Sequence, residues 1–168
     1  MSFLKPLNLG LRALAFFCSF IVMALTGNMV SDWGRGNGGT INYSLFVSVW
    51  GMLTLLYLIP ATLKESLVFH PILPLLLDIL NCIFWFCGAV ALAAKLGAHN
   101  CNNQSWVKSN YIIAGSKSRC REAQAADVFM FFGFFAFLLS CIASGFGNRG
   151  GANLRPGGVR GPPVMAQV

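Results

Sequence analysis

The stretch that decides the fold is residues 72–94, ILPLLLDILNCIFWFCGAVALAA, in which Asp78 is the one charged side chain. Three similar apolar runs occupy residues 11–30, 43–63 and 125–146. An α-helix needs about 20 mostly apolar residues to cross the hydrocarbon core of a bilayer. Each run meets that length, so the sequence predicts four membrane-spanning helices.

The composition favours the same class of protein. The chain has 168 residues, of which 56% are hydrophobic and 10% charged, and its mean hydropathy is +0.66. A soluble domain carries about a quarter charged residues. The core helices of a soluble bundle would also alternate apolar and polar faces, whereas these runs are apolar nearly all round. We therefore expect an all-α membrane protein.

The remaining length leaves room for one domain only. Residues 1–146 are expected to form a single four-helix membrane bundle. Residues 147–168 are rich in Gly, Pro and Arg, cannot bury a core, and are expected to form a disordered cytosolic tail. The first run resembles a signal peptide, with Lys5 and Arg12 as its basic region, but no small-residue cleavage site follows, so we expect it to be retained.

The net charge of +7 indicates neither a nucleic-acid site nor the orientation of the chain in the membrane. The basic residues lie between the runs and in the tails, where they would meet lipid headgroups or anchor helix ends. An even number of spans puts both termini on one side, and the basic residues divide equally between the two sides. On the terminus side these are Lys5, Arg12, Lys64, Arg149, Arg155 and Arg160. On the other side they are Arg35, Lys95, Lys108, Lys117, Arg119 and Arg121.

The third connection, residues 95–124, supplies two markers of orientation. It contains Cys101 and Cys120, the two cysteines outside the runs, and such a pair suggests a disulfide, which persists on an oxidising face. It also contains an N-glycosylation acceptor pattern at Asn103, with a serine two residues later. A second such pattern, at Asn42, lies too near the second run to be used. We therefore expect both termini in the cytosol.

Polar groups inside the third run are the natural place to look for chemistry. Asp78 and Asn81 are three residues apart, so they share one face of a helix. One interpretation is a proton or substrate site. The other is a node of hydrogen bonds between helices, with Asp78 protonated or bonded to a hydroxyl or amide. A transport path would need more polar groups, so the node is favoured and no catalytic residue is predicted.

Metal and thiol chemistry find little support. The two histidines, His70 and His99, fall near opposite membrane faces, and Cys82 and Cys87 lack the spacing of a thiol oxidoreductase. No metal or other cofactor is therefore expected, and the four cysteines within the runs are interpreted as small core residues.

The fourth run carries more phenylalanine than a small bundle can bury. We expect Phe129, Phe132 and Phe135 to face lipid or another protein. Small residues in the third and fourth runs favour close helix contacts. Together these features favour packing and lateral association over catalysis.

Four segments resemble one family. LDILN at 77–81, AHNCNN at 98–103, RCREAQA at 119–125 and PVMAQV at 163–168 are similar to segments of the fungal MARVEL-domain proteins of the non-classical export protein type. The resemblance implies a four-helix membrane bundle with cytosolic termini, resident in eisosome-organised furrows of the plasma membrane. It also implies a response to sphingolipid and a role for the end of the tail in organising the domain.

The leading hypothesis is a non-enzymatic organiser of a sterol- and sphingolipid-rich membrane patch that associates with itself or with a larger membrane protein. One alternative is a small accessory or regulatory subunit of a larger transporter or pump. Another is a small transporter or channel built around Asp78.

Overall fold

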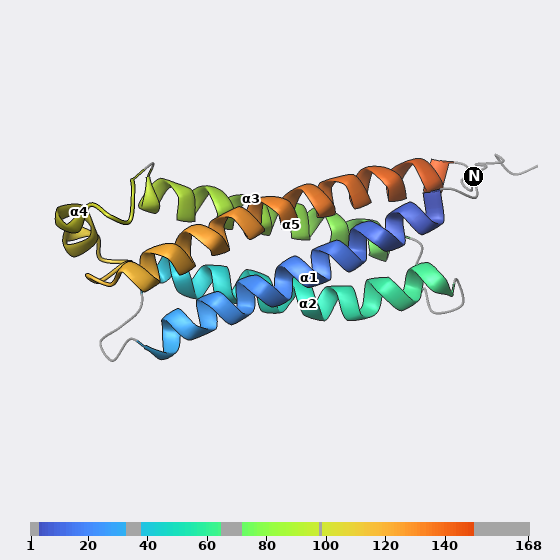
Figure 1. Ribbon diagram of the computed structural model, residues 1–168. Helices are drawn as coiled ribbons and strands as arrows, with labels where there is room; N and C mark the ends of the chain where they lie inside the picture. The colour runs from blue at the N-terminus through green and yellow to red at the C-terminus, as the bar shows by residue number, and fades with distance from the viewer. Residues whose placement is uncertain (1–3, 33–37, 65–71, 98, 150–168) are drawn as a thin grey trace, which may run out of the picture.

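The computed structural model describes residues 4–32, 38–64, 72–97 and 99–149, and they form a bundle of long helices (Figure 1). The long helices are α1 (Leu4–Ser31), α2 (Gly39–Leu63), α3 (Leu73–Leu96) and α5 (Lys117–Arg149), and the short helix α4 (Gln104–Ser109) lies between α3 and α5. All four long helices are long and apolar enough to cross a membrane. The predicted class, an all-α membrane protein with four spans, is confirmed.

The helices differ from the predicted runs chiefly at their polar ends. α1 begins at Leu4 rather than at residue 11, and α5 begins at Lys117 rather than at residue 125. Hydropathy marks only the part of a helix that matches the hydrocarbon, and a helix continues into its polar flanks. α5 continues to Arg149, three residues into the expected tail; residues 150–168 of that tail lie outside the described residues.

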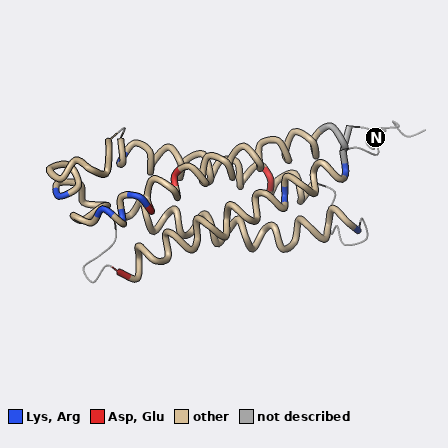
Figure 2. The backbone as a smooth tube through the Cα atoms, in the orientation of Figure 1, with Lys and Arg blue, Asp and Glu red and all other residues tan. Residues whose placement is uncertain are grey.

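The packing order of the helices places α1 and α3 on a diagonal. α1 packs against α2 and α5, and α3 packs against α5 and more sparsely against α2. The bundle therefore has two ends. α1 starts at one of them, which we call the network end, and α4 lies at the other, which we call the loop end (Figure 1). Figure 2 shows Lys and Arg gathered toward these two ends, with few charged residues between them.

The centre of the bundle is filled by a tryptophan that reaches two glycines. The Trp85 side chain is fully buried, and its ring centroid lies 5.6 Å from that of Phe137. A Cβ atom at Gly133 of α5 would overlap the Trp85 ring, and one at Gly51 of α2 would come within 3.0 Å of its Nε1. The missing side chains at these glycines make room for the indole, as small residues do where membrane helices pack closely.

Candidate functional site

The feature that stands out in the interior is a buried ion pair. Arg12 of α1 and Asp78 of α3 are joined by an Nη2–Oδ2 contact of 2.9 Å, and their side chains are 3% and 0% exposed. Because α1 and α3 are diagonal neighbours, this pair bridges the bundle from corner to corner. It lies near the network end, since Arg12 is eight residues, or about 12 Å, along α1 from Leu4.

The Arg12 guanidinium contacts the other two long helices as well. Nη1 donates to the Leu58 carbonyl oxygen at 2.5 Å and to the Thr62 hydroxyl, both on α2. Nε donates to the Ser140 hydroxyl on α5 at 3.3 Å. One side chain on α1 thus holds all three of its neighbours, and the planar, multi-donor geometry of arginine permits this where lysine would not.

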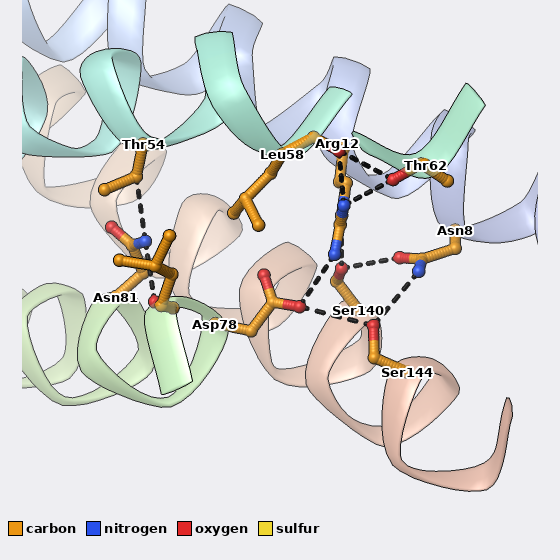
Figure 3. Close-up of polar contacts among 10 residues, drawn as sticks. Asn8, Arg12, Thr54, Leu58, Thr62, Asp78, Asn81, Ser140 and Ser144 are labelled. Atoms are coloured by element: carbon orange, nitrogen blue, oxygen red, sulfur yellow. Dashed lines mark hydrogen bonds and ion pairs between the residues drawn. The ribbon is translucent and has the colours of Figure 1, made fainter. Parts of the chain in front are cut away.

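Two serines and an asparagine complete the cluster (Figure 3). The Ser144 hydroxyl donates to Asp78 Oδ2 at 3.3 Å, and Ser140 donates to Asn8 Oδ1 at 2.6 Å. Asn8 Nδ2 in turn donates to Ser144 Oγ at 3.1 Å. We call this cluster the Arg12 network; its side chains are those of Asn8, Arg12, Thr62, Asp78, Ser140 and Ser144.

The physical reason for the network is the cost of charge in the membrane. A single ionised side chain at the centre of a spanning helix costs about 2.5–3.5 kcal/mol on insertion scales. Pairing two opposite charges, with hydroxyls around them, offsets this cost. The network can therefore hold helices in register.

One expectation about these residues needs correction, and another was incomplete. Arg12 was expected to meet headgroups or anchor a helix end, but its residue surface is 2% exposed and it lies inside the bundle. Asp78 was expected to be protonated or to bond a hydroxyl or amide; it bonds the Ser144 hydroxyl, but its main partner is the Arg12 cation. The signal that could have revealed the pair was the position of Arg12 within the first apolar run.

Asn81 does not join this network. Its Nδ2 donates to the Thr54 hydroxyl on α2 at 2.9 Å and to the Leu77 carbonyl of its own helix at 2.8 Å. The two polar residues of the third run therefore serve different contacts: Asp78 reaches across the diagonal, and Asn81 reaches the adjacent helix.

The loop end is held differently. Cys101 and Cys120 form the predicted disulfide, with 5.8 Å between their Cα atoms, and it ties the segment after α3 to the first turn of α5. Beside it, Arg119 Nη1 donates to the Met29 carbonyl near the end of α1 at 2.9 Å. Asn28 Nδ2 donates to Glu122 Oε1 at 3.1 Å on the exposed surface.

Two of the three phenylalanines of α5 that were expected to face outward are exposed. Phe132 and Phe135 are 55% and 53% exposed, whereas Phe129 is half-buried against the core.

The cysteines expected in the core differ in burial: Cys18 is buried, but Cys87 is exposed on the outside of the bundle. In the part of the chain that the structure describes, no three His, Cys, Asp or Glu residues gather as a metal site, and His70 lies outside it.

Comparisons with known proteins agree with this architecture. The MARVEL family, a membrane-associating domain, matches residues 3–143. The chain is 34% identical to non-classical export protein 2 of Saccharomyces cerevisiae, over 94% of this chain and 95% of that one. It is 34% identical to non-classical export protein 102 of Candida albicans over the same shares, 94% and 95%.

A second Saccharomyces cerevisiae protein, non-classical export protein 2 homolog 1, is 38% identical over 76% of this chain and 79% of its own length. No solved structure matches the chain. The family match covers most of the chain, and it agrees with the four apolar helices of the structure. The chain belongs to the MARVEL family of membrane-associating domains.

Proposed function

We propose that this protein is a non-enzymatic organiser of plasma-membrane microdomains of the eisosome or furrow type. It sits in the plasma membrane with both termini in the cytosol, and it acts through lateral contacts of its sides with sphingolipid, sterol and other copies of itself. Membership in a family of membrane-associating domains, together with relatives named non-classical export proteins, supports a role in the membrane rather than catalysis.

The observation that carries the proposal is the division between the interior and the sides of the bundle. Two charged side chains of the interior, Arg12 and Asp78, bond to each other and to neighbouring hydroxyls. A third, Arg119, bonds the Met29 carbonyl. The sides carry large apolar side chains that are half or more exposed, among them Phe17, Phe20, Leu53, Leu56, Phe132 and Phe135. Polar groups that hold helices together leave the sides as the part of the molecule that meets partners.

The transporter alternative is less well supported. A carboxylate that carries protons or substrate must exchange partners during the cycle, whereas Asp78 Oδ2 is held by Arg12 and Ser144 together. The variant Asp78→Asn addresses this alternative in reconstituted vesicles. Saturable solute uptake by the natural chain that is lost in the variant would favour transport and contradict our proposal.

A map of neighbours in living cells tests the organiser proposal. A photo-crosslinking amino acid placed at Phe132 should capture lipid and a second copy of the chain. Blocking sphingolipid synthesis should reduce capture of the second copy. The matched control is the same probe at Leu53, which is 59% exposed on α2. That side of the bundle does not carry Phe132 and Phe135. One constant large protein partner at both positions would favour an accessory subunit and contradict the proposal.

A further inference from the structure

The chain contains two Asn-x-Ser acceptor patterns, and the structure separates them. Asn42 lies in the first turns of α2, and the serine of its pattern, Ser44, is fully buried. The Ser44 hydroxyl donates to the Thr40 carbonyl of its own helix at 3.0 Å. N-glycosylation acceptors lie in surface loops, so this pattern, folded into a packed helix, does not present an acceptor.

The pattern at Asn103 has the opposite properties. Asn103, Gln104 and Ser105 are all exposed, and the backbone of Asn103 is extended, with φ −76° and ψ 99°. Asn103 is the N-cap of α4 and Gln104 its first residue, and α4 lies at the far tip of the loop end, beyond the ends of the long helices (Figure 1). The whole pattern therefore faces outward from the bundle.

The hydrogen bonds of Asn103 orient its amide. Its Oδ1 accepts from the Ser105 hydroxyl at 2.8 Å and from the Trp106 backbone N–H at 3.5 Å. Both partners act as donors, so the oxygen of the amide faces the short helix and Nδ2 faces away from it. Among the described residues, none accepts a hydrogen bond from this Nδ2, which is the atom that would carry a sugar.

The disulfide supplies independent evidence for the compartment. Cys101 precedes Asn103 by two residues, and its bond to Cys120 closes the same loop. Disulfides persist in the oxidising lumen and at the cell surface, the compartments of secreted glycoproteins. This step rests on the orientation given under the proposed function, with the loop end facing away from the cytosol.

We infer that Asn103 carries an N-linked oligosaccharide and that Asn42 does not. The donor is an oligosaccharide linked to a lipid pyrophosphate. Asn103 Nδ2 forms a bond to the anomeric carbon of the first sugar, the bond from that carbon to the pyrophosphate oxygen breaks, and the proton that Nδ2 loses passes to water. The lipid pyrophosphate leaves, and no oxidant or reductant is needed. The glycan stands over the tip of the bundle, so the sides remain free for lateral contacts.

The test uses the full chain with an N-terminal epitope tag, expressed in yeast and digested with peptide N-glycosidase. The natural chain should gain mobility on a denaturing gel after digestion. Asn103→Gln and Ser105→Ala should each migrate like the digested chain before digestion. Asn42→Gln and Ser105→Thr should behave as the natural chain does, because the first leaves the acceptor pattern at Asn103 intact and the second retains its hydroxyl.

A natural chain whose mobility does not change would overturn the inference. Labelling the denatured chain with a thiol reagent, before and after reduction, then separates the two proposals. Oxidised loop cysteines without a glycan would leave the orientation and the organiser proposal standing. Reduced loop cysteines without a glycan would contradict the orientation as well.

Discussion

The two ends of the bundle are held together by different means. At the network end, six side chains from four helices bond to one another, three of them buried and three partly buried, around the ion pair of Arg12 and Asp78. At the loop end, a covalent bond between Cys101 and Cys120 is accompanied by hydrogen bonds such as Asn28 to Glu122, which is exposed. The difference follows from the surroundings of each end.

Inside the bundle, water does not compete for hydrogen bonds, so a polar network is strong when its members are paired. On the exposed surface of the loop end, where Asn28 bonds Glu122, water competes, and such surface bonds contribute about 0–1 kcal/mol each. The bond of Arg119 to the Met29 carbonyl at the same end is buried. A covalent bond does not suffer competition from water. Among the described residues, the network end is therefore held by buried and partly buried polar bonds, the loop end by a disulfide as well as by buried and exposed polar bonds, and each end can be broken separately.

The largest effect is expected from breaking the ion pair. Arg12→Leu or Asp78→Leu leaves one charge buried without its partner, which should cost about 3–5 kcal/mol of unfolding free energy. Equilibrium unfolding of the purified chain in mixed micelles measures this. The double variant Arg12→Leu/Asp78→Leu removes both charges and should be clearly more stable than either single variant. A double variant as unstable as the two single losses added together would show that the charges act independently.

The next effect should come from the loop end. The double variant Cys101→Ser/Cys120→Ser opens a loop of 19 residues, which should cost about 3 kcal/mol. Thermal unfolding with and without a reducing agent checks this, because reduction of the natural chain should reproduce the loss. Cys87→Ser, at the exposed free cysteine, is the control and should unfold like the natural chain. If reduction destabilised Cys101→Ser/Cys120→Ser as much as it destabilises Cys87→Ser, the loop bond would not be the source of the loss.

A smaller effect is expected between the two ends, where Trp85 fills the centre of the bundle. Gly133→Ala places a methyl group on the Trp85 ring, and this overpacking should cost about 1–3 kcal/mol. Gly145→Ala on the same helix meets nothing within 4 Å and is the matched control. Unfolding of the two variants side by side measures the difference. Equal stability would mean that α5 does not approach α3 closely at this point.

The smallest effect is expected at the single hydrogen bond between α2 and α3. Thr54→Val keeps the side-chain volume but removes the acceptor for Asn81, and should cost about 0.6 kcal/mol, the average for such bonds in membrane bundles. A double-mutant cycle with Asn81→Leu measures the coupling. The coupling energy between Thr54 and Asn81 should be smaller than that between Arg12 and Asp78. Equal coupling energies would contradict the view that the ion pair at the network end is the strongest polar link of the bundle.

The parts of this architecture that sequence predicts are those that depend on local pattern. The four spans follow from runs of apolar residues, and the disulfide follows from two cysteines outside them. The pairing of Arg12 with Asp78 was missed because it depends on which helices face each other across the diagonal, and hydropathy carries no such information. Asp78 and Asn81 were correctly placed on one helix face, but that face meets two different neighbours.

The three phenylalanines of α5 also show what the sequence pattern alone could not predict, namely which way each side chain faces. Residues three apart on a helix rotate by about 60° per step, because three residues fall short of a full turn of 3.6. From Phe129 to Phe135 the direction therefore changes by about 120°. The structure accordingly turns Phe129 partly inward, while Phe132 and Phe135 remain exposed.

We propose that the sides of this protein carry its function and that its interior carries its stability. The direct measurement is the fraction of a fluorescently tagged chain that co-localises with eisosomes in the plasma membrane. Arg12→Leu/Asp78→Leu should keep that fraction, because it changes only the interior, whereas Phe132→Ala/Phe135→Ala should disperse the chain over the membrane. The contrary result would be that Arg12→Leu/Asp78→Leu, at normal stability, disperses over the membrane while Phe132→Ala/Phe135→Ala still co-localises with eisosomes. That result would contradict the account.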